Sequence, residues 1–554
     1  MTVEQQANAS EGAPLGPNGV SAAKATERKK LFGREFYKSL GSPTMILAPM
    51  VDRSEFAWRV LTRSYMDPKS SNDLLAYSPM LHARLFQENA TFRCQYFQPT
   101  RPAQPAADGS STEGTVPHLD GNPAIDRPLI VQFCANKPDE LLQAGQHVQT
   151  FCDAVDLNLG CPQGIAKKGH YGAFLQEDWD LIYKLINKLH KELSIPVTAK
   201  FRILETKEKT LEYAKMILSA GASIISVHGR RREQKGHNTG LADWSYIRYL
   251  RDNLPPETVI FANGNILNHS DIEKCLEATG ADGVMSAEGN LTDPTIFGQA
   301  PPVGQEGREY WRGKDGIGGY RLDAVLRRYM DIIYKYVLEV PGPERKPLFL
   351  PSDPVKEEPR LGSPKKDGED AEDGPPKKKQ KRGKEQKVTS PSLTAMQGHL
   401  FQLLRPLVSK HTNVRDCLAK TKAGNMAGFE NIVSLVEGVV KAGIQEYEQF
   451  PERFDKPEAS SSTDGGLTGS KATIAEYKRP WWVCQPHVRP LPEEAIEKGA
   501  LQLKKKDKEA AKKEDQSCTP TEASVLSETK ATNVASESTL ENGVSSTPDA
   551  LVSG

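Results

Sequence analysis

The sequence predicts an α/β protein, a (β/α)8 TIM barrel followed by a small all-helical domain, with disordered termini and a disordered linker. From about residue 47 to residue 297, short apolar runs alternate with longer amphipathic runs. Repeated β-then-α units in this number indicate either a closed barrel or a doubly wound open sheet. The span of about 250 residues matches a barrel. No G-x-G-x-x-G follows the first strand, which disfavours the open dinucleotide-binding sheet.

Eight strands are expected, because near-continuous apolar runs suit a parallel sheet that is buried on both faces. They are residues 45–48, 75–77, 129–133, 154–159, 197–201, 224–228, 259–262 and 283–286. Amphipathic helices are expected between them at 55–64, 138–150, 179–193, 207–220, 244–252 and 268–278, and several start at good N-caps such as Asp178. The segment 95–126 is rich in Pro, Gly and Ser and is expected to be a surface loop.

Beyond the barrel, the pattern predicts helices and polar linkers. Helices are expected at 317–337, 393–410, 414–420 and 429–442. Trp481 and Trp482 would be unusual in a free tail, so the segment around them is expected to dock on the folded part. The predicted units are a disordered segment 1–40, the barrel 41–305, a helical domain made of 310–350 and 391–450, a charged disordered linker 351–390, a docked segment 472–492 and a disordered tail 493–554.

Composition excludes several classes of protein. Hydrophobic residues are 37% of the chain, which fits a globular core with unburied segments. Lys+Arg and Asp+Glu both number 72, which excludes a uniformly basic nucleic-acid binder but not a local basic face. The eight cysteines form no C-x-x-C pair and no compact disulfide framework, so we expect no zinc and a reducing compartment, the cytoplasm or the nucleus. No apolar run of membrane length or secretory type appears, and no membrane association is expected.

Candidate functional residues stand where the predicted strands end, since barrel enzymes place their chemistry at the carboxyl ends of the strands. They offer one thiol, one amine, one imidazole, several amides and Gly-rich turns, which suits a phosphate-bearing organic cofactor with a Cys acid or nucleophile. No carboxylate cluster indicates a metal. In chain order the set is Pro49, Met50, Val51, Gln132, Cys161, Lys200, His228, Asn263, Gly264, Asn265, Ala287 and Glu288.

Each of these residues also has a purely structural interpretation. Cys161 alone fits a packed thiol, and His228 alone fits a core histidine. Asn263 and Gly264 fit a simple turn, and the basic run at 230–232 fits a solvated surface. Lys200 is harder to explain in this way, because buried lysines are rare unless they are paired. Taken together, the set favours a functional site.

The motifs resemble those of the tRNA-dihydrouridine synthases. The string DAVDLNLGCPQGIAKKGHYGAFL at 153–175 carries the family's N-x-G-C-P hallmark. LAPMVDRSEFAWR (47–59), PVTAKFRI (196–203), VHGRRREQKG (227–236), FANGNI (261–266) and ADGVMSAEGNL (281–291) follow in family order. The pair Glu288–Gly289 and the string RPWWVCQPHVRP (479–490) are most similar to the eukaryotic subgroup that acts on D-loop uridines 16 and 17.

This resemblance implies FMN as cofactor and NADPH as reductant. It implies that Pro49, Met50 and Val51 pass along the flavin, that Gln132 and Lys200 hold its pyrimidine edge, and that His228 contacts it. Asn263, Gly264, Asn265, Ala287 and Glu288 would line the phosphate end, and Cys161 would be the general acid. The helical domain would bind tRNA, and the implied phosphate contacts on the active face are Arg230, Arg232, Lys235, Lys167 and Lys168. A monomer is expected.

Two departures from the family pattern bear on the site. Many members carry Gly-Arg where this chain has Ala287-Glu288, so backbone N–H groups would have to bind the phosphate, or Glu288 would have to point away. Arg231 replaces a usual threonine. Two other functions remain open: another FMN-dependent barrel reductase of a small pyrimidine or enoate, and a non-catalytic tRNA-binding chaperone. The basic run 377–387 fits a nuclear localisation signal, an RNA-binding arm or a plain charged linker.

Overall fold

The barrel predicted from the sequence is confirmed in the computed structural model, which describes residues 30–67, 74–103, 114–354, 390–454 and 469–497. Each strand pairs in parallel with the next, and the last pairs with the first, so the sheet closes. The eight strands, in chain order, are β1 (Met45–Leu47), β2 (Leu74–Tyr77), β6 (Leu129–Cys134), β7 (Ala154–Leu159), β8 (Val197–Arg202), β9 (Ile224–His228), β10 (Val259–Asn263) and β11 (Gly283–Ser286).

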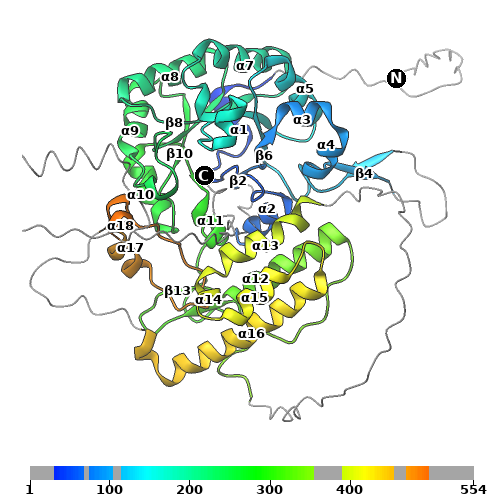
Figure 1. The fold of residues 1–554 in the computed structure, drawn as a ribbon, viewed down its shortest axis with the longest axis vertical. Helices are drawn as coiled ribbons and strands as arrows, with labels where there is room; N and C mark the ends of the chain where they lie inside the picture. Colours follow the sequence, from blue (N-terminus) through cyan, green and yellow to red (C-terminus); the bar gives the residue numbers. More distant parts are fainter. Residues whose placement is uncertain (1–29, 68–73, 104–113, 355–389, 455–468, 498–554) are drawn as a thin grey trace, which may run out of the picture.

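Helices surround the barrel and bury its outer face (Figure 1). Nearly every strand residue is buried, as the continuous apolar runs require of a sheet that is covered on both sides. The surrounding helices are α2 (Phe56–Arg63), α3 (Ala83–Glu88), α4 (Ala90–Tyr96), α5 (Pro138–Val148), α7 (Trp179–Glu192), α8 (Lys207–Ser219), α9 (Trp244–Asn253) and α10 (Ser270–Thr279). A short strand β3 (Leu81–His82) adds to β6, and α6 (Gly164–Gly169) and α11 (Glu288–Thr292) follow β7 and β11.

The expectation of disorder up to residue 40 is wrong for α1 (Gly33–Ser39). Phe36 and Tyr37 are buried against the barrel, and the Tyr37 hydroxyl donates to the carbonyls of Pro43 (3.1 Å) and Asp282 (2.9 Å). Two adjacent aromatic residues supply enough buried area to hold one short helix in place. Residues 1–29 lie outside the described part of the chain.

The expectation of a surface loop at 95–126 is also wrong in part. Its described residues form an antiparallel pair, β4 (Thr100–Pro102) with β5 (Thr115–Pro117). Asp120 and Asp126 then turn inward and bind the fully buried guanidinium of Arg59, at 2.8 and 2.5 Å. A buried guanidinium needs acceptors for its donors, and two carboxylates supply them here. The Pro, Gly and Ser content of the segment did not predict that two of its carboxylates are buried.

The helical region contains one β-hairpin and several helices, and it differs from the expectation at three points. The helix expected at 429–442 is longer and runs from Met426 to Gln449. The helix expected at 317–337 begins only at Leu322, because residues 318–320 pair within the hairpin. The helix expected at 393–410 is split near Leu404, since Pro406 has no N–H with which to continue the ladder. The elements are β12 (Tyr310–Arg312), β13 (Gly318–Tyr320), α12 (Leu322–Ile332), a π-helix (Ile333–Leu338), α13 (Pro391–Leu403), α14 (Arg405–Val408), α15 (Thr412–Lys420) and α16 (Met426–Gln449).

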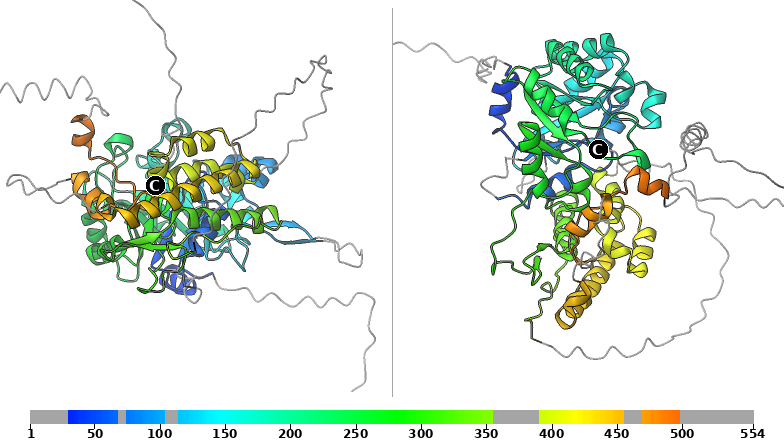
Figure 2. Two further views of the ribbon diagram at one scale, coloured as in Figure 1. Left: turned by 90° about the horizontal axis from the view of Figure 1, so that it is seen from below. Right: turned by 90° about the vertical axis from the view of Figure 1, so that its left-hand side faces the viewer.

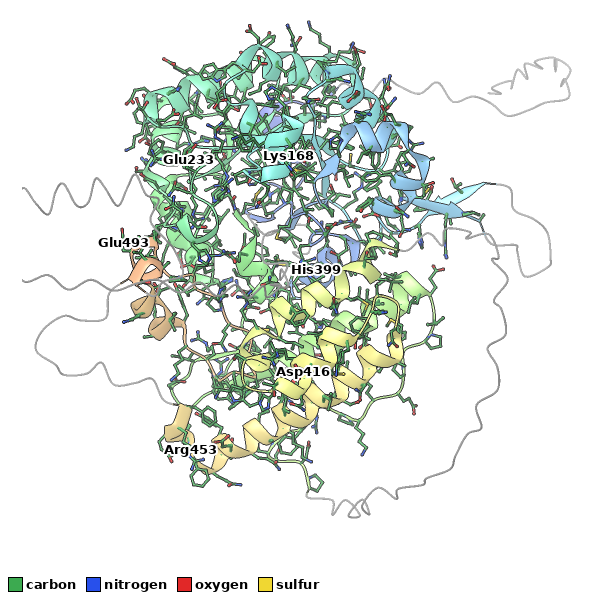
Figure 3. All side chains as sticks on the ribbon, viewed as in Figure 1. Lys168, Glu233, His399, Asp416, Arg453 and Glu493 are labelled. Carbon is green, nitrogen blue, oxygen red and sulfur yellow. The ribbon has the colours of Figure 1, made fainter. Side chains whose placement is uncertain are left out.

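This region lies on one side of the barrel (Figure 2) and packs on α2 and α11, the helices that follow β1 and β11. His399 of α13 is fully buried at the junction (Figure 3), where its Nε2 lies 2.9 Å from the Glu55 carboxylate. Its ring stacks on Trp58 of α2 with centroids 3.9 Å apart. The helical region is therefore fixed to the side of the barrel where the candidate residues gather.

The last described segment, 469–497, begins beside the barrel, passes to the helical region and returns to the barrel (Figure 1). It consists of α17 (Gly469–Tyr477), an extended stretch 478–491 that we call the strap, and α18 (Pro492–Glu497). The strap carries the fully buried Trp482. Residues 493–497, which were expected to belong to the disordered tail, are helical instead. The rest of that tail, the linker residues 355–389 and the basic run 377–387 lie outside the described residues.

Within the described ranges, no helix combines the length and apolarity needed to cross a bilayer. The same residues contain no group of three or more His, Cys, Asp and Glu side chains placed to hold a metal ion.

Candidate active site

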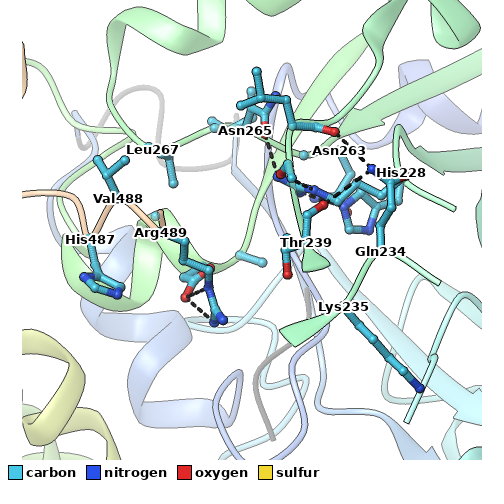
Figure 4. A pocket seen from close by; sticks show the side chains of 18 of the residues that line it. His228, Gln234, Lys235, Thr239, Asn263, Asn265, Leu267, His487, Val488 and Arg489 are labelled. Atoms are coloured by element: carbon cyan, nitrogen blue, oxygen red, sulfur yellow. Dashed lines mark hydrogen bonds and ion pairs between the residues drawn. The ribbon is translucent and has the colours of Figure 1, made fainter. Parts of the chain in front are cut away.

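A cavity of about 560 Å³ opens at the carboxyl end of the barrel. Its walls come from the turns after β9, β10 and β11 and from the strap (Figure 4). Its predicted lining residues are His228, Arg230, Lys235, Asn263, Gly264, Asn265, Ala287 and Glu288. The size falls in the range of small-molecule sites. The barrel thus brings together residues that are up to 60 positions apart in sequence, because parallel strands end at one edge.

The Cys161 thiol follows β7 in a turn fixed by hydrogen bonds. The Asn158 side-chain oxygen accepts from the backbone N–H groups of Gly160 (3.1 Å) and Cys161 (2.9 Å). Arg202 Nε donates to the Gly160 carbonyl at 2.8 Å and holds the turn from the next strand. Burial raises the pKa of the Cys161 thiol above its ordinary value. The thiol is therefore protonated at neutral pH, as a proton donor must be.

Gln132 is fully buried at the end of β6, and its amide orientation is determined by two neighbours. Its Nε2 donates to Asp156 at 2.8 Å, and its Oε1 accepts from Asn158 Nδ2 at 2.8 Å. Thr198 donates to the second Asp156 oxygen at 2.6 Å. Burial raises the pKa of Asp156 to about 6. This network links the middle of the barrel to the Cys161 turn, while the flavin contact of Gln132 stays a prediction.

Lys200 places an ammonium group between the thiol turn and the cavity. The residue is 6% exposed, and Nζ donates to Asn263 Oδ1 at 3.1 Å. Asn263 in turn donates to the Met285 carbonyl at 3.0 Å. Burial, with the nearby charge of Arg202, lowers the pKa of Lys200 to about 8. Its buried charge therefore has little compensation from the protein itself, which favours a role toward a bound anion.

His228 is neutral, because burial and the cations Arg202, Lys200 and Arg230 lower its pKa well below the ordinary value. Its Nε2 lies 3.1 Å from Arg230 Nη1. A guanidinium only donates, so Nε2 accepts and Nδ1 carries the ring proton. His228 thus offers one N–H donor at the end of β9.

The resemblance implies Arg230 as a tRNA phosphate contact on the active face, and the structure places it there, half-buried in the cavity wall. Its tRNA contact stays a prediction. Its guanidinium donates to the Gly240 carbonyl at 2.9 Å and to Asn265 Oδ1 at 2.6 Å. These hydrogen bonds hold the side chain in the cavity wall, and a charge run in sequence does not reveal this direction. Burial lowers its pKa to about 10.

The turns after β10 and β11 are formed by close backbone contacts. Gly264 has φ of +114°, and a Cβ there would lie 2.7 Å from Ala242 Cβ. At Gly289 a Cβ would lie 2.2 Å from the Ile266 carbonyl oxygen. Glu288 does not face the cavity alone, because Arg489 of the strap binds its carboxylate at 2.6 Å. The carboxylate that departs from the family pattern is thus neutralised by a residue about 200 positions away.

The remaining predicted residues lie in the turn after β1, on α6 and in the loop after β9. Pro49, Met50 and Val51 form the turn between β1 and α2, where Met50 N–H donates to Ser54 at 3.0 Å. Lys235 Nζ donates to the Pro162 carbonyl next to Cys161, at 2.6 Å. The last three basic candidates are the exposed pair Lys167 and Lys168 on α6, and Arg232, which is paired with Glu177 and Glu233.

Three residues of the site were given no role from sequence: Asn158, Arg202 and Arg489. The signal for Asn158 and Arg202 is their position at the ends of β7 and β8, close to Cys161 and Lys200. The signal for Arg489 was the tryptophan-rich segment around it, which indicated docking but not where it docks.

The donor set suits a phosphate-bearing ligand. Arg202, Arg230 and Arg489 line the cavity, against Glu288 and Asp271. The tight turns at Gly264 and Gly289 leave backbone groups close to the cavity, where no side chain fits. Guanidinium groups and bare backbone are what phosphate groups commonly bind.

Comparison with known proteins identifies the family. A profile described as "Dihydrouridine synthase (Dus)" matches residues 46–314. The chain is 43% identical over 472 residues to the tRNA-dihydrouridine(16/17) synthase (NAD(P)(+)) of Saccharomyces cerevisiae, which covers 85% of this chain and 90% of that one. The counterpart from Schizosaccharomyces pombe is 43% identical over 463 residues, with 84% and 92% covered. A tRNA-dihydrouridine(20a/20b) synthase of S. cerevisiae is 29% identical over 263 residues, with 47% and 63% covered. This chain therefore belongs to the tRNA-dihydrouridine synthase family of oxidoreductases.

Proposed function

We propose that this protein reduces uridines 16 and 17 in the D-loop of tRNA to 5,6-dihydrouridine, with FMN as cofactor and NADPH as reductant. The relatives named for positions 16 and 17 match over most of both chains at 43% identity, whereas the relative named for 20a and 20b matches less than half of this one at 29%. The observation that carries the proposal is the turn that holds the protonated Cys161 thiol within electrostatic reach of Lys200, whose Nζ donates to Asn263 in the wall of a phosphate-type cavity.

The reaction saturates the C5=C6 bond of uracil, which requires a hydride at C6 and a proton at C5. Reduced FMN, when bound, supplies the hydride. Cys161 Sγ donates the proton to C5, and the thiolate then regains a proton from water. The raised pKa of Cys161 keeps the proton available at neutral pH. The Asn158 side-chain oxygen accepts from the Cys161 backbone N–H and so fixes the position of the turn that carries the thiol.

Lys200 and His228 orient and stabilise charge in this scheme. The Lys200 ammonium supplies a positive charge where negative charge accumulates on reduction, and its pKa of about 8 leaves it mostly protonated at pH 7. His228 offers its Nδ1–H as a donor toward the cavity. The side-chain amide of Gln132 has one orientation, because it is hydrogen-bonded to Asp156 and Asn158.

The substrate base must leave its stack to reach Cys161, as for other base-modifying enzymes. Loop bases are accessible already, so the D-loop lowers this cost. Lys167, Lys168 and Lys235 lie around the thiol turn and are the proposed phosphate contacts. Binding through them should weaken as salt rises.

The two other functions considered from sequence are less favoured. Family membership and coverage of 90% of a tRNA-modifying relative favour tRNA over a free pyrimidine or enoate. The intact thiol turn and the buried lysine favour an enzyme over a non-catalytic tRNA-binding chaperone. Turnover of a free small substrate without tRNA would favour the first alternative.

The test is a position-by-position map of dihydrouridine in tRNA from source cells that lack this protein. The cells are rescued with wild type, with Cys161→Ala, or with Cys94→Ala, which removes an exposed thiol on α4. We expect loss at positions 16 and 17 that wild type and Cys94→Ala restore and Cys161→Ala does not. Full rescue by Cys161→Ala would remove Cys161 as the acid, and an unchanged map in the deleted cells would contradict the assigned substrate.

A further inference from the structure

One wall of the candidate cofactor cavity comes from the far end of the chain. The strap passes over the turns after β10 and β11, and Figure 4 shows Arg489, Val488 and His487 on the side of the cavity opposite His228 and Gln234. Five consecutive strap residues line the cavity, from His487 to Leu491. The barrel strands alone therefore do not complete this site.

Arg489 is fixed in place by Glu288, the residue at which the turn after β11 enters α11. Arg489 Nη2 donates to Glu288 Oε1 at 2.6 Å, and Nε donates to the two carboxylate oxygens at 2.9 and 3.0 Å. The two side chains are 36% and 26% exposed, so water screens this pair only in part. This ion pair holds the Arg489 guanidinium at the cavity wall.

Arg230 belongs to the same charge group. The charge of Glu288 raises the pKa of Arg230, and the charge of Arg489 lowers it, although burial has the larger effect. Two guanidiniums and one carboxylate thus share this end of the cavity. All three line the cavity together with the tight backbone turns at Gly264 and Gly289.

We propose that the strap is part of the cofactor site and that Arg489, positioned by Glu288, acts with Arg230 as a two-guanidinium clamp on the phosphate of FMN. This inference rests on the proposed function, since it takes FMN as the ligand. Planar guanidinium forks match phosphate oxygens in geometry and charge. Glu288 orients the clamp and prevents the two cations from repelling each other before the phosphate binds.

The strap is anchored at a distance from the cavity, mainly to the helical region. Trp482 carbonyl accepts from Leu322 N–H at 2.8 Å, and Cys484 N–H donates to the Tyr320 carbonyl at 2.9 Å. His487 Nε2 lies 3.0 Å from Arg405 of α14. Trp481 and Trp482 pack where Gly443 leaves space on α16. The helical region therefore holds the wall that contacts the cofactor.

The experiment compares FMN with riboflavin, which lacks only the phosphate. Purified full-length protein is freed of bound flavin, and both dissociation constants are measured from flavin fluorescence. Arg489→Ala should weaken FMN binding about tenfold or more and change riboflavin binding by less than about twofold, because charge-assisted hydrogen bonds to phosphate are lost. Arg453→Ala is the control, since Arg453 is an exposed arginine in the helical region. Equal losses for both flavins, or no loss for either, would overturn the clamp.

A second pair of variants tests the wall without touching the cavity. A Cβ at Gly443 would lie 2.7 Å from both Trp481 and Trp482, whereas a Cβ at Gly438 in the same helix meets no atom within 4 Å. Gly443→Ala should displace the strap and weaken FMN binding, and Gly438→Ala should leave it unchanged. Unchanged FMN binding in Gly443→Ala would contradict the role of the strap. A wild type that binds neither flavin would instead overturn the proposed function, and this inference with it.

Discussion

The residues at the barrel mouth show how burial adjusts charge for a task. Burial raises the pKa of Cys161, so the thiol keeps a proton that it can give. The same effect lowers the pKa of Lys200 to about 8 and keeps His228 neutral. One low-dielectric environment thus produces a donor thiol, a cation near its titration point and an uncharged imidazole.

Lys200 should cost stability in the protein without its cofactor. Between pH 8 and the ordinary lysine pKa of about 10.4, the unfolded chain holds a proton that the folded chain has released, so folding stability rises with pH. Below pH 8 the full cost of the buried charge remains, about 3 kcal/mol. Lys200→Met removes this dependence. Urea unfolding from pH 7 to 9.5 should show the variant's advantage shrinking as pH rises, and parallel pH profiles for the two proteins would contradict it.

At the scale of elements, the eight barrel strands and the longer barrel helices could be predicted to within two residues, because their apolar periodicity is strong. The short helices α3, α4 and α6 and the ends of α16 could not. The exceptions have physical reasons. Pairing within a hairpin delays the start of α12, and Pro406 divides α13 from α14. The short helix α1 depends on tertiary contacts of two aromatic residues, which a local pattern in a polar segment does not display.

The element α1 should contribute measurably to barrel stability. Phe36 is 4% exposed, whereas Phe32 at the start of the same helix is 46% exposed. Phe36→Ala should lower the free energy of unfolding by about 3 kcal/mol through lost burial and a cavity. Phe32→Ala, the matched control, should change it by less than about 1 kcal/mol. Equal effects in urea denaturation would mean that α1 does not pack as described.

The placement of candidate residues could be predicted where they stand near strand ends, but not where the fold brings in a distant part of the chain. Cys161, Lys200 and His228 follow or end strands, and the closed barrel places them at one edge. Arg230 was predicted on the active face, but its hydrogen bonds to Gly240 and Asn265, which turn it into the cavity wall, could not be read from the basic run in the sequence. The partner of Glu288 lies about 200 residues away, and no spacing rule reaches that far.

At the scale of the whole molecule, zero net charge requires that tRNA binding depend on local basic patches. Lys167 and Lys168 are exposed on α6 beside the thiol turn. Replacing both with Gln should lower the slope of log affinity against log salt by roughly 1.5, since each phosphate contact contributes about 0.7–0.9. Lys184→Gln, an exposed lysine of α7, should leave the slope unchanged. Filter binding of tRNA at several salt concentrations measures this, and an unaltered slope in the double variant would exclude the pair as phosphate contacts.

The position of the strap near residue 490 has a consequence for synthesis in the cell. The barrel strands end at Ser286, so the ribosome completes the barrel long before it makes Arg489. At about 5–20 residues per second, roughly 10–40 s separate the two events. A nascent chain in that interval holds the residues of the thiol turn but not those of the strap. On the proposed role of the strap, cofactor capture is therefore one of the last steps of biogenesis, and a chain that ends upstream of the strap lacks this wall of the site.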